Sequence, residues 1–373
     1  MATSGRIRVV IVDDSAVMRS LLRSVISADG ELEVAGTAAD GASALNCIES
    51  VRPDLVLLDV EMPVMDGLAT LRELRRRGHK MPVVMCSSLT QRGAQVTLEA
   101  LAGGASDYVT KPSGQSGREE AARMLAQELT PKIRALTAQP QSAPLMFSPA
   151  VPSRAEAIAA TPSVLAIGVS TGGPAALDVL LPQLPRDFPL PVLIVQHMPE
   201  LFTRLFAERL NGRCRLAVSE AAEGNAVTAG LVQVARGNWH MEVRGPMRTG
   251  APATVHLQQG PLENHCRPAV DVLFRSVAEV YGAGVLGVVL TGMGSDGMVG
   301  CQVIRGRGGS VLAQNQASST VWGMPGAVVN AGLAQKVLPL NAMVPEILRI
   351  AAATNTAGRE PLKTGREFLK SVV

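Results

Sequence analysis

Three apolar runs in the second half of the chain each lead into one member of a Ser, His, Asp set. The runs are Val164–Ser170, Pro191–His197 and Val285–Asp296. Short apolar runs of this kind predict buried strands of an α/β sheet. Because ligands of open α/β sheets bind beyond the carboxyl ends of the strands, we expect the serine, histidine and aspartate to meet. A nucleophile, a base and a carboxylate brought together are typical of a hydrolase.

The first half of the chain carries a similar series of short β-rich runs, separated by helix-compatible stretches. The runs are Arg8–Val12, Leu55–Leu58, Val83–Cys86 and Tyr108–Val109. A helix over roughly residues 118–136 would close this half. The alternation is typical of a parallel α/β domain. The predicted fold class is therefore α/β, with two doubly wound parallel-sheet domains.

The length of the chain agrees with two domains. At 373 residues it is long for one domain, and each of two could bury its own core. We expect domains over residues 1–136 and 164–352. Residues 137–163 between them are rich in Pro, Ser and Ala, which is linker composition. Residues 353–373 form a C-terminal tail, where disorder is usual.

Composition excludes several classes of function. The formal charge is +3 and aromatic residues are 3%, which argues against a nucleic-acid surface. Five cysteines, an odd number without metal-type spacing, are typical of reduced thiols in a cytosol. No apolar run is long enough to cross a bilayer, and acidic residues follow the N-terminus too soon for a signal peptide. We expect a cytoplasmic protein without membrane insertion.

Acidic residues follow the predicted strands of the first domain. Asp13 and Asp14 come directly after the first run, Asp59 ends the second, and Lys111 follows the fourth. Three carboxylates held together repel one another unless a divalent cation lies among them, and Mg²⁺ prefers oxygen ligands. One carboxylate could then accept a phosphoryl group, with the Lys111 ammonium stabilising the transferred oxygens.

Four stretches of the first half form a recognisable set: VDDS at 12–15, LLDVEMPVMDG at 57–67, MCSS at 85–88 and DYVTKP at 107–112. With them, residues 7–136 resemble a response-regulator receiver domain. The resemblance implies that Asp59 is the phosphoacceptor. It also implies a Mg²⁺ pocket completed by Asp13 and Asp14, with the Glu61 carbonyl.

The same resemblance assigns three further residues of the first domain. Ser87 and Tyr108 would be the switch pair that follows the phosphoryl group, and Lys111 would contact that group. A receiver indicates that the protein is switched by phosphorylation. The output has to be inferred from the second half.

Ser170 lies in a sequence that matches G-x-S-x-G, from Gly168 to Gly172. This pattern exposes a serine on a tight turn between a strand and a helix. Main-chain N–H groups at a helix N-terminus can stabilise an oxyanion there. The pattern by itself equally fits a glycine-rich turn in which Ser170 is an N-cap.

The histidines narrow the choice of a general base. Among the five, His197 alone closes a strongly apolar strand, beside the predicted end of the Ser170 strand. His79 lies in the basic end of a receiver helix, and His256 lies in an alternating run. His240 and His265 lie in polar loops that could be at the surface.

Asp296 lies in the glycine-rich loop TGMGSDG at 291–297, which allows two interpretations. Its carboxylate could orient His197. The same loop fits G-x-G-x-x-G after a strand, which is a dinucleotide-binding pattern. That alternative requires an acidic residue at the end of the next strand, and the run Ser310–Asn315 ends in Gln314 and Asn315 instead.

The chain order Ser, His, Asp differs from the Ser, Asp, His order of α/β-hydrolases. Four stretches point elsewhere: GVSTGGP at 168–174, QHMP at 196–199, RPAVDVLF at 267–274 and TGMGSDGMVG at 291–300. They resemble the catalytic domain of the chemotaxis response-regulator protein-glutamate methylesterases, over about residues 164–352. Many members of that family carry Ala-Pro-Gly where this chain has Ala235, Arg236 and Gly237. The departure concerns a local loop and not the Ser, His, Asp set.

The resemblance implies a phosphorylation-activated hydrolase of glutamate γ-methyl esters on chemoreceptors, with glutamine deamidation there too. Ser170 would be the nucleophile, His197 the base and Asp296 its orienting carboxylate. The Met293 main-chain N–H and Thr171 would serve the oxyanion, and no cofactor would be needed for hydrolysis. Implied partners are methyl-accepting chemoreceptors and a histidine kinase as phosphodonor, without nucleic acid. A receiver joined to a module that only docks on receptors is the non-enzymatic alternative.

Overall fold

The structure, a computed structural model, describes residues 5–112, 117–138, 161–245 and 251–357. Most of the predicted linker and most of the predicted tail lie outside the described residues. The last helix runs past residue 352, so the predicted end of the second domain falls inside that helix.

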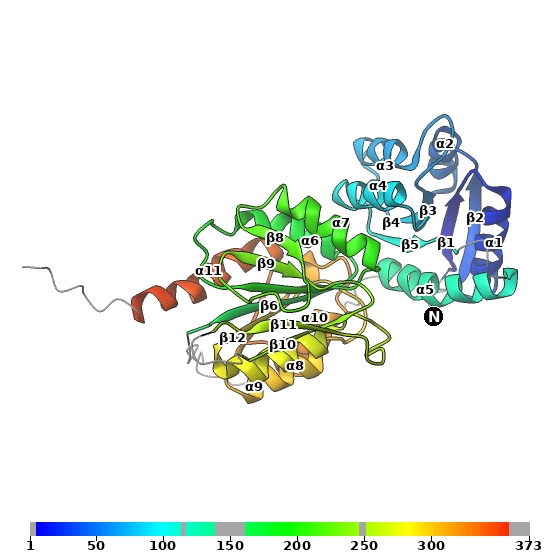
Figure 1. Cartoon of the computed structure of the whole chain (residues 1–373). Coiled ribbons are helices and arrows are strands. Elements are labelled where there is room, and N and C mark those ends of the chain that lie inside the picture. The colour runs from blue at the N-terminus through cyan, green and yellow to red at the C-terminus, as the bar shows by residue number, and fades with distance from the viewer. Residues whose placement is uncertain (1–4, 113–116, 139–160, 246–250, 358–373) are drawn as a thin grey trace, which may run out of the picture.

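The first domain is built on a five-stranded parallel sheet. Its strands are β1 (Ile7–Val12), β2 (Leu32–Ala38), β3 (Leu55–Asp59), β4 (Val83–Ser87) and β5 (Asp107–Thr110), in the order β2-β1-β3-β4-β5. This is the doubly wound, flavodoxin-like order. Its helices are α1 (Ala16–Ser27), α2 (Gly41–Val51), α3 (Gly67–Arg76), α4 (Gln91–Ala102) and α5 (Arg118–Thr137). The helices lie on both sides of the sheet (Figure 1).

Strand β2 is absent from the sequence-based expectation, whereas the other four strands occur within a residue or two of the predicted runs. β2 is an edge strand whose middle five residues are only half-buried. An edge strand needs no continuous apolar run, so it leaves a weak pattern in the sequence. Polar N-caps mark where several of these helices begin, as when Asp66 accepts a 2.7 Å hydrogen bond from Ala69 N at the start of α3.

The second domain is built on a seven-stranded parallel sheet, in the order β14-β13-β12-β6-β7-β9-β8. The strands are β6 (Val164–Val169), β7 (Val192–Gln196), β8 (Ala217–Glu220), β9 (Leu231–Val234), β12 (Val285–Val289), β13 (Ser310–Gln314) and β14 (Lys336–Leu338). A hairpin of β10 (His240–Arg244) and β11 (Thr254–Gln258) is separate from this sheet. The predicted class, two doubly wound parallel-sheet domains, is confirmed.

Helices cover both faces of the larger sheet (Figure 1). They are α6 (Gly173–Leu180), α7 (Glu200–Asn211), α8 (Val270–Tyr281), α9 (Met298–Gly306), α10 (Met324–Asn330) and α11 (Leu340–Ala357), with short 3-10 helices at Leu181–Gln183, Gly282–Gly284 and Gln316–Ser318. Alternate residues of β6 pack on opposite sides: Leu165 and Ile167 join the core under α6 and α7, whereas Val164 and Ala166 join the core under α8. A strand buried on both faces reads as a continuous apolar run, which is why this one is visible in the sequence.

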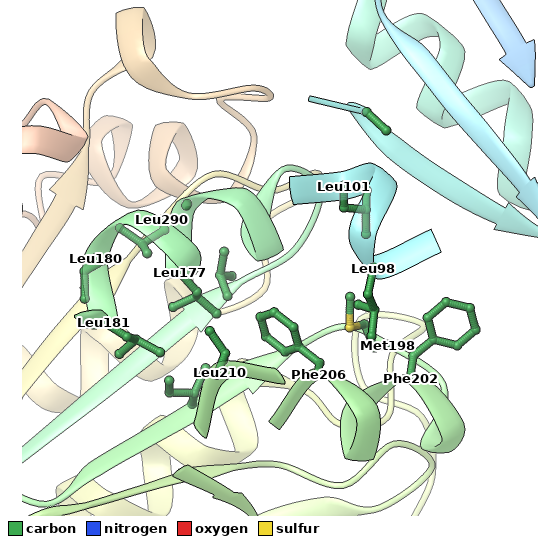
Figure 2. Close-up of a cluster of buried hydrophobic side chains, with 14 of the residues drawn as sticks. Leu98, Leu101, Leu177, Leu180, Leu181, Met198, Phe202, Phe206, Leu210 and Leu290 are labelled. Atoms are coloured by element: carbon green, nitrogen blue, oxygen red, sulfur yellow. The ribbon is translucent and has the colours of Figure 1, made fainter. Parts of the chain in front are cut away.

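The two domains share a buried apolar interface. Figure 2 shows Leu98 and Leu101 of α4 in one cluster with side chains of the second domain, among them Met198 and Phe202. Arg209 of α7 adds a polar tie, since it donates a 2.8 Å hydrogen bond to the Leu98 carbonyl. The receiver-like domain is thus packed against the carboxyl-end side of the second domain in this structure.

Candidate active site

Ser170 is the first residue after β6, and Thr171 and Gly172 separate it from the start of α6. Its main-chain N–H donates a 3.0 Å hydrogen bond to the Thr291 carbonyl, which ties the end of β6 to the loop after β12. The turn depends on Gly172, whose φ of +78° is the left-handed conformation that suits glycine. A Cβ at Gly172 would also overlap the Thr320 side chain. The predicted tight turn between strand and helix is present.

His197 directly follows β7 and pairs with Asp296. Its Nε2 lies 2.8 Å from Asp296 Oδ2, and the imidazole is 14% exposed. Burial disfavours the charged ring, but the hydrogen bonds to Asp296 and to the Cys266 side chain outweigh burial and raise the pKa of His197. An imidazolium is therefore well stabilised at this position, as a general base requires after it takes a proton.

Asp296 is held by the N-terminus of α8. Its Oδ2 accepts a 2.7 Å hydrogen bond from Val270 N, and its Oδ1 accepts one of 3.0 Å from Asp271 N. Gly297 N also donates to Oδ1. Although burial opposes it, the hydrogen bond from His197 and these amides keep the pKa of Asp296 below its usual value. The carboxylate stays anionic and fixed in direction.

Ser170 and His197 line the same cavity of about 520 Å³. The Ser170 hydroxyl and the imidazole share no hydrogen bond in this structure, and such bonds are often loose in free enzymes. Since Nε2 is engaged by Asp296, Nδ1 is the nitrogen left to receive a proton. Cys266 contacts the imidazole and lines this cavity too.

The two residues expected near the oxyanion differ in position. The Thr171 hydroxyl is turned away toward the first domain, where it donates a 2.7 Å hydrogen bond to Asp107 Oδ2. Its carbonyl accepts a 2.9 Å hydrogen bond from Thr291 Oγ1. Met293 lies half-buried in the loop after β12. The roles of Thr171 and Met293 at the oxyanion stay predictions.

A second polar site lies at the carboxyl end of the first sheet. The carboxylates of Asp13, Asp14 and Asp59 come within 4.8 Å of one another. Lys111 Nζ lies 2.7 Å from both Asp13 and Asp59. Burial raises the pKa of Asp59, Lys111 opposes this shift, and the charge of Asp13 adds to it. An all-oxygen donor set with one exposed member, Asp14, fits a hard divalent cation.

Both residues of the predicted switch pair are buried. Ser87 is fully buried, and its Oγ donates a 3.2 Å hydrogen bond to the Ser88 carbonyl. Tyr108 stacks on Phe202 of the second domain, with ring centroids 4.6 Å apart and planes 11° from parallel. A residue assigned as a switch therefore lies directly in the interface between the domains.

Comparisons with known proteins match each of the two domains to a known family. The family model for the CheB methylesterase matches residues 165–347, and the model for the response regulator receiver domain matches residues 9–123. A protein-glutamate methylesterase/protein-glutamine glutaminase of Trichodesmium erythraeum is 47% identical over 350 residues, which cover 92% of this chain and 99% of that relative. The chain belongs to this methylesterase family.

Other similar proteins carry the same description. A protein-glutamate methylesterase/protein-glutamine glutaminase of a Nocardioides species is 48% identical over 92% of this chain and 95% of its own length. Among solved structures, the CheB methylesterase catalytic domain of Thermotoga maritima is 36% identical, with a TM-score of 0.49, and covers 51% of this chain and all of that one. The curated relatives and the two family models show that the chain is a hydrolase with a response-regulator receiver, so the purely docking alternative is rejected.

One expectation for this methylesterase is wrong. His240, expected in a polar loop that could lie at the surface, begins β10 and is 1% exposed. Its Nε2 lies 2.9 Å from the Pro261 carbonyl, and its Nδ1 accepts a hydrogen bond from Ala269 N. Both ring nitrogens thus hold main-chain groups, which a polar local sequence does not reveal.

The methylesterase site also contains residues that the sequence did not single out. Asn264 donates a 2.9 Å hydrogen bond to Asp296, and Cys266 contacts His197. Both stand in the segment ENHC, directly before the RPAVDVLF stretch that carries the family resemblance. Their nearness to that stretch is the one signal that could have found them.

Arg236, where many family members have proline, makes a defined contact. Its Nε donates a 2.8 Å hydrogen bond to Glu200 Oε1, and its guanidinium lies 5.6 Å from the Trp239 ring. Gly237 next to it cannot carry a side chain, since a Cβ would overlap the Pro199 and Glu200 main chain. The loop is thus closely fitted to α7 with arginine in place.

Two further observations bear on the remaining expectations. Gln314, at the end of β13, accepts a 2.8 Å hydrogen bond from Thr291 N through its side chain, so it supports the loop after β12 rather than facing a ribose. Across the described ranges, no helix combines the length and the apolar character needed to cross a membrane.

Proposed function

We propose that the chain is a phosphorylation-activated esterase that hydrolyses glutamate γ-methyl esters on chemoreceptors, and that it deamidates receptor glutamines at the same site. The observation that carries the proposal is the 2.8 Å contact of His197 with Asp296, together with the cavity that His197 and Ser170 both line. The family to which the chain belongs supports the choice of substrate.

Each residue of the set has a distinct role in the proposed reaction. The Ser170 hydroxyl attacks the ester carbonyl while His197 Nδ1 accepts its proton and returns it to the leaving methanol. Asp296 holds Nε2 and stabilises the imidazolium. Water then attacks the acyl-enzyme and releases glutamate, with His197 again as the base. For glutamine the leaving group is ammonia, and the remaining steps are the same.

The oxyanion of the tetrahedral intermediate needs donors near Ser170. Ser170 lies shortly before the start of α6 and is tied to the loop after β12 through Thr291, so both segments can supply main-chain N–H groups, which supports the proposed parts of Thr171 and Met293. No cofactor takes part in this proposed hydrolysis.

The receiver supplies the regulation. We assign Asp59 as the phosphoacceptor, with Asp13, Asp14 and Asp59 as the residues that would hold Mg²⁺. The cation would supply charge compensation for the phosphoryl oxygens. Lys111, already 2.7 Å from Asp59, would contact the transferred group. A histidine kinase of the chemotaxis system is the proposed phosphodonor, with the receptors as substrate.

In the unphosphorylated chain, the receiver narrows access to the active site. Asp107, Tyr108 and Lys132 line the same cavity as Ser170 and His197. A receptor helix needs that space, so we propose that phosphorylation moves β5 and α5 away. The proposed location is the cytoplasm, which agrees with all five cysteines being free.

Methanol release from methylated receptor tests the proposal. The full chain should release methanol slowly, and a small phosphodonor with Mg²⁺ should accelerate the release. Deamidation is followed separately as ammonia released from receptor that carries glutamine at the same positions. Receptor binding without release of either product would overturn the proposed function.

A further inference from the structure

Two buried carboxylates lie side by side beneath the proposed active site. Asp271, the second residue of α8, and Asp296 are each 2% exposed. Burial raises the pKa of Asp271, the Gly300 amide opposes this shift, and the charge of Asp296 adds to it. Two like charges in a buried site compete for a proton, so one of them ionises at the expense of the other unless donors intervene.

A single side-chain amide bridges the pair. Asn264 Nδ2 lies 2.9 Å from Asp296 Oδ1 and 3.0 Å from Asp271 Oδ2. The other donors to these carboxylates are the His197 imidazole, which takes part in the proposed reaction, and main-chain N–H groups, which a side-chain substitution leaves in place. Asn264 is thus the neutral side chain whose substitution can change how strongly Asp271 and Asp296 compete to stay ionised.

The segment that carries Asn264 is held from outside the site. His240 contacts its main chain at Pro261 and again at Ala269. Arg267 donates a 2.8 Å hydrogen bond to the Gly260 carbonyl. Asn264 itself has a φ of +52°, a left-handed conformation that asparagine tolerates better than most residues. The anchored turn therefore holds the Asn264 side-chain amide in position between the two carboxylates.

Other charged groups around the pair come from three elements. His197 at the end of β7 donates to Asp296, and Cys266 contacts the same imidazole. Arg275 of α8 and Glu263 form a 2.5 Å ion pair on the outer side. Arg275 is paired with Glu263 and does not lie between the two carboxylates. The group that bridges Asp271 and Asp296 is therefore the neutral amide of Asn264.

We propose that Asn264 is a positioning residue of the esterase, which keeps Asp296 ionised and directed at His197 while Asp271 lies beside it. This inference rests on the proposed function, because Asp296 acts on the reaction only through His197. It differs from a purely structural role in that its effect depends on Asp271 and on pH.

The test compares Asn264→Ala, Asn264→Asp, and Asn264→Ala combined with Asp271→Asn, all in the full chain. Each form receives the same small phosphodonor, and methanol release is measured against pH at an equal phosphorylated fraction. Asn264→Ala should lower kcat roughly tenfold to a hundredfold, the scale for loss of a hydrogen bond to a charged group. KM should stay nearly unchanged, and the acid limb of the kcat profile should move to higher pH.

The Asn264→Asp variant and the double variant test the direction in which the acid limb of the kcat profile moves. Asn264→Asp replaces a donor by a third carboxylate of the same size, so its acid limb should move further in the same direction. Asp271→Asn in the Asn264→Ala background removes the competing charge, so the acid limb should return toward that of the unmodified chain with most of kcat. An unchanged kcat in Asn264→Ala, or a loss without a pH shift and without relief by Asp271→Asn, would overturn the proposal.

A measurement that needs no turnover separates this inference from the proposed function. The proton on His197 Nε2, bonded to Asp296, is followed by NMR in the full chain as the pH is lowered. In Asn264→Ala this signal should be lost at a higher pH than in the unmodified chain, and equal titrations would refute the role of Asn264. A chain that releases no methanol would defeat the proposed function, while the NMR titration still decides the part played by Asn264.

Discussion

The hydroxyl of Thr171, the residue after the proposed nucleophile, donates a 2.7 Å hydrogen bond to Asp107 in receiver strand β5. Both residues are buried, and Lys132 lies 3.5 Å from the same Asp107 oxygen. The next residue, Tyr108, stacks on Phe202 of α7. A shift of the proposed switch at β5 therefore reaches the main chain beside Ser170 through one side-chain contact.

This contact predicts that Asp107→Ala raises the activity of the unphosphorylated chain. A hydrogen bond to a charged group contributes roughly 1.5–3 kcal/mol, so its loss should increase methanol release by about tenfold to a hundredfold. The control is Asp54→Ala, which removes another receiver carboxylate that accepts a main-chain hydrogen bond, from Arg8, away from the interface. Equal rates in the two variants would show that the Thr171 contact does not restrain the enzyme.

A fragment that begins near Thr161 should hydrolyse receptor esters faster than the unphosphorylated full chain, because it lacks Tyr108 and the other receiver residues that line the cavity. Phosphorylation of the full chain should close most of that difference, and Asp59→Ala should hold the rate low. Rates are compared at equal concentration on one receptor preparation. A fragment no faster than the unphosphorylated chain would leave the receiver as a targeting domain.

The proposed catalytic set predicts unequal losses. Ser170→Ala and His197→Ala should each abolish methanol release without unfolding the chain. Asp296→Asn should lower kcat by a large factor and leave some turnover, since the group that orients the base usually matters less than the nucleophile. Circular dichroism checks the fold of each variant. Near-normal release by Ser170→Ala would falsify the mechanism.

Phosphorylation should require Asp59 and Mg²⁺. The cluster of Asp13, Asp14 and Asp59 cannot hold a phosphoryl group without a compensating cation, since Lys111 alone offsets one of their charges. Labelling with a small phosphodonor is measured with and without EDTA, and in Asp59→Ala. Labelling that persists with the chelator or in the variant would count against the receiver assignment.

The ion pair of His197 and Asp296 predicts a pH window for stability. The pKa of His197 is raised, so its contribution is full below the ordinary value of 6.5 and is lost as pH rises toward about 10. The pKa of Asp296 is lowered, so its contribution is present above 3.8 and is lost at lower pH. The thermal unfolding temperature of Asp296→Asn should therefore differ most from that of the unmodified chain between pH 3.8 and pH 6.5. A difference that does not change with pH would contradict the ion pair.

Much of the site could be predicted because local patterns reveal buried parallel strands. Ser170, His197 and Asp296 each follow such a strand, and the carboxyl ends of parallel strands lie at one edge of the sheet. The acidic cluster around Asp59 was predictable for the same reason. Strand β2 was not, since a half-buried edge strand carries no continuous apolar run.

Which polar residues stand at strand ends can be read from the sequence alone, because a buried strand requires an apolar run along the chain. What those residues touch depends on the three-dimensional packing. His240 is buried by packing of a hairpin on α8, Asn264 reaches Asp296 from a left-handed turn, and Thr171 meets a residue of the other domain. Such contacts join positions far apart in the chain, and they depend on loop conformation and domain packing, which leave no periodic pattern in the sequence.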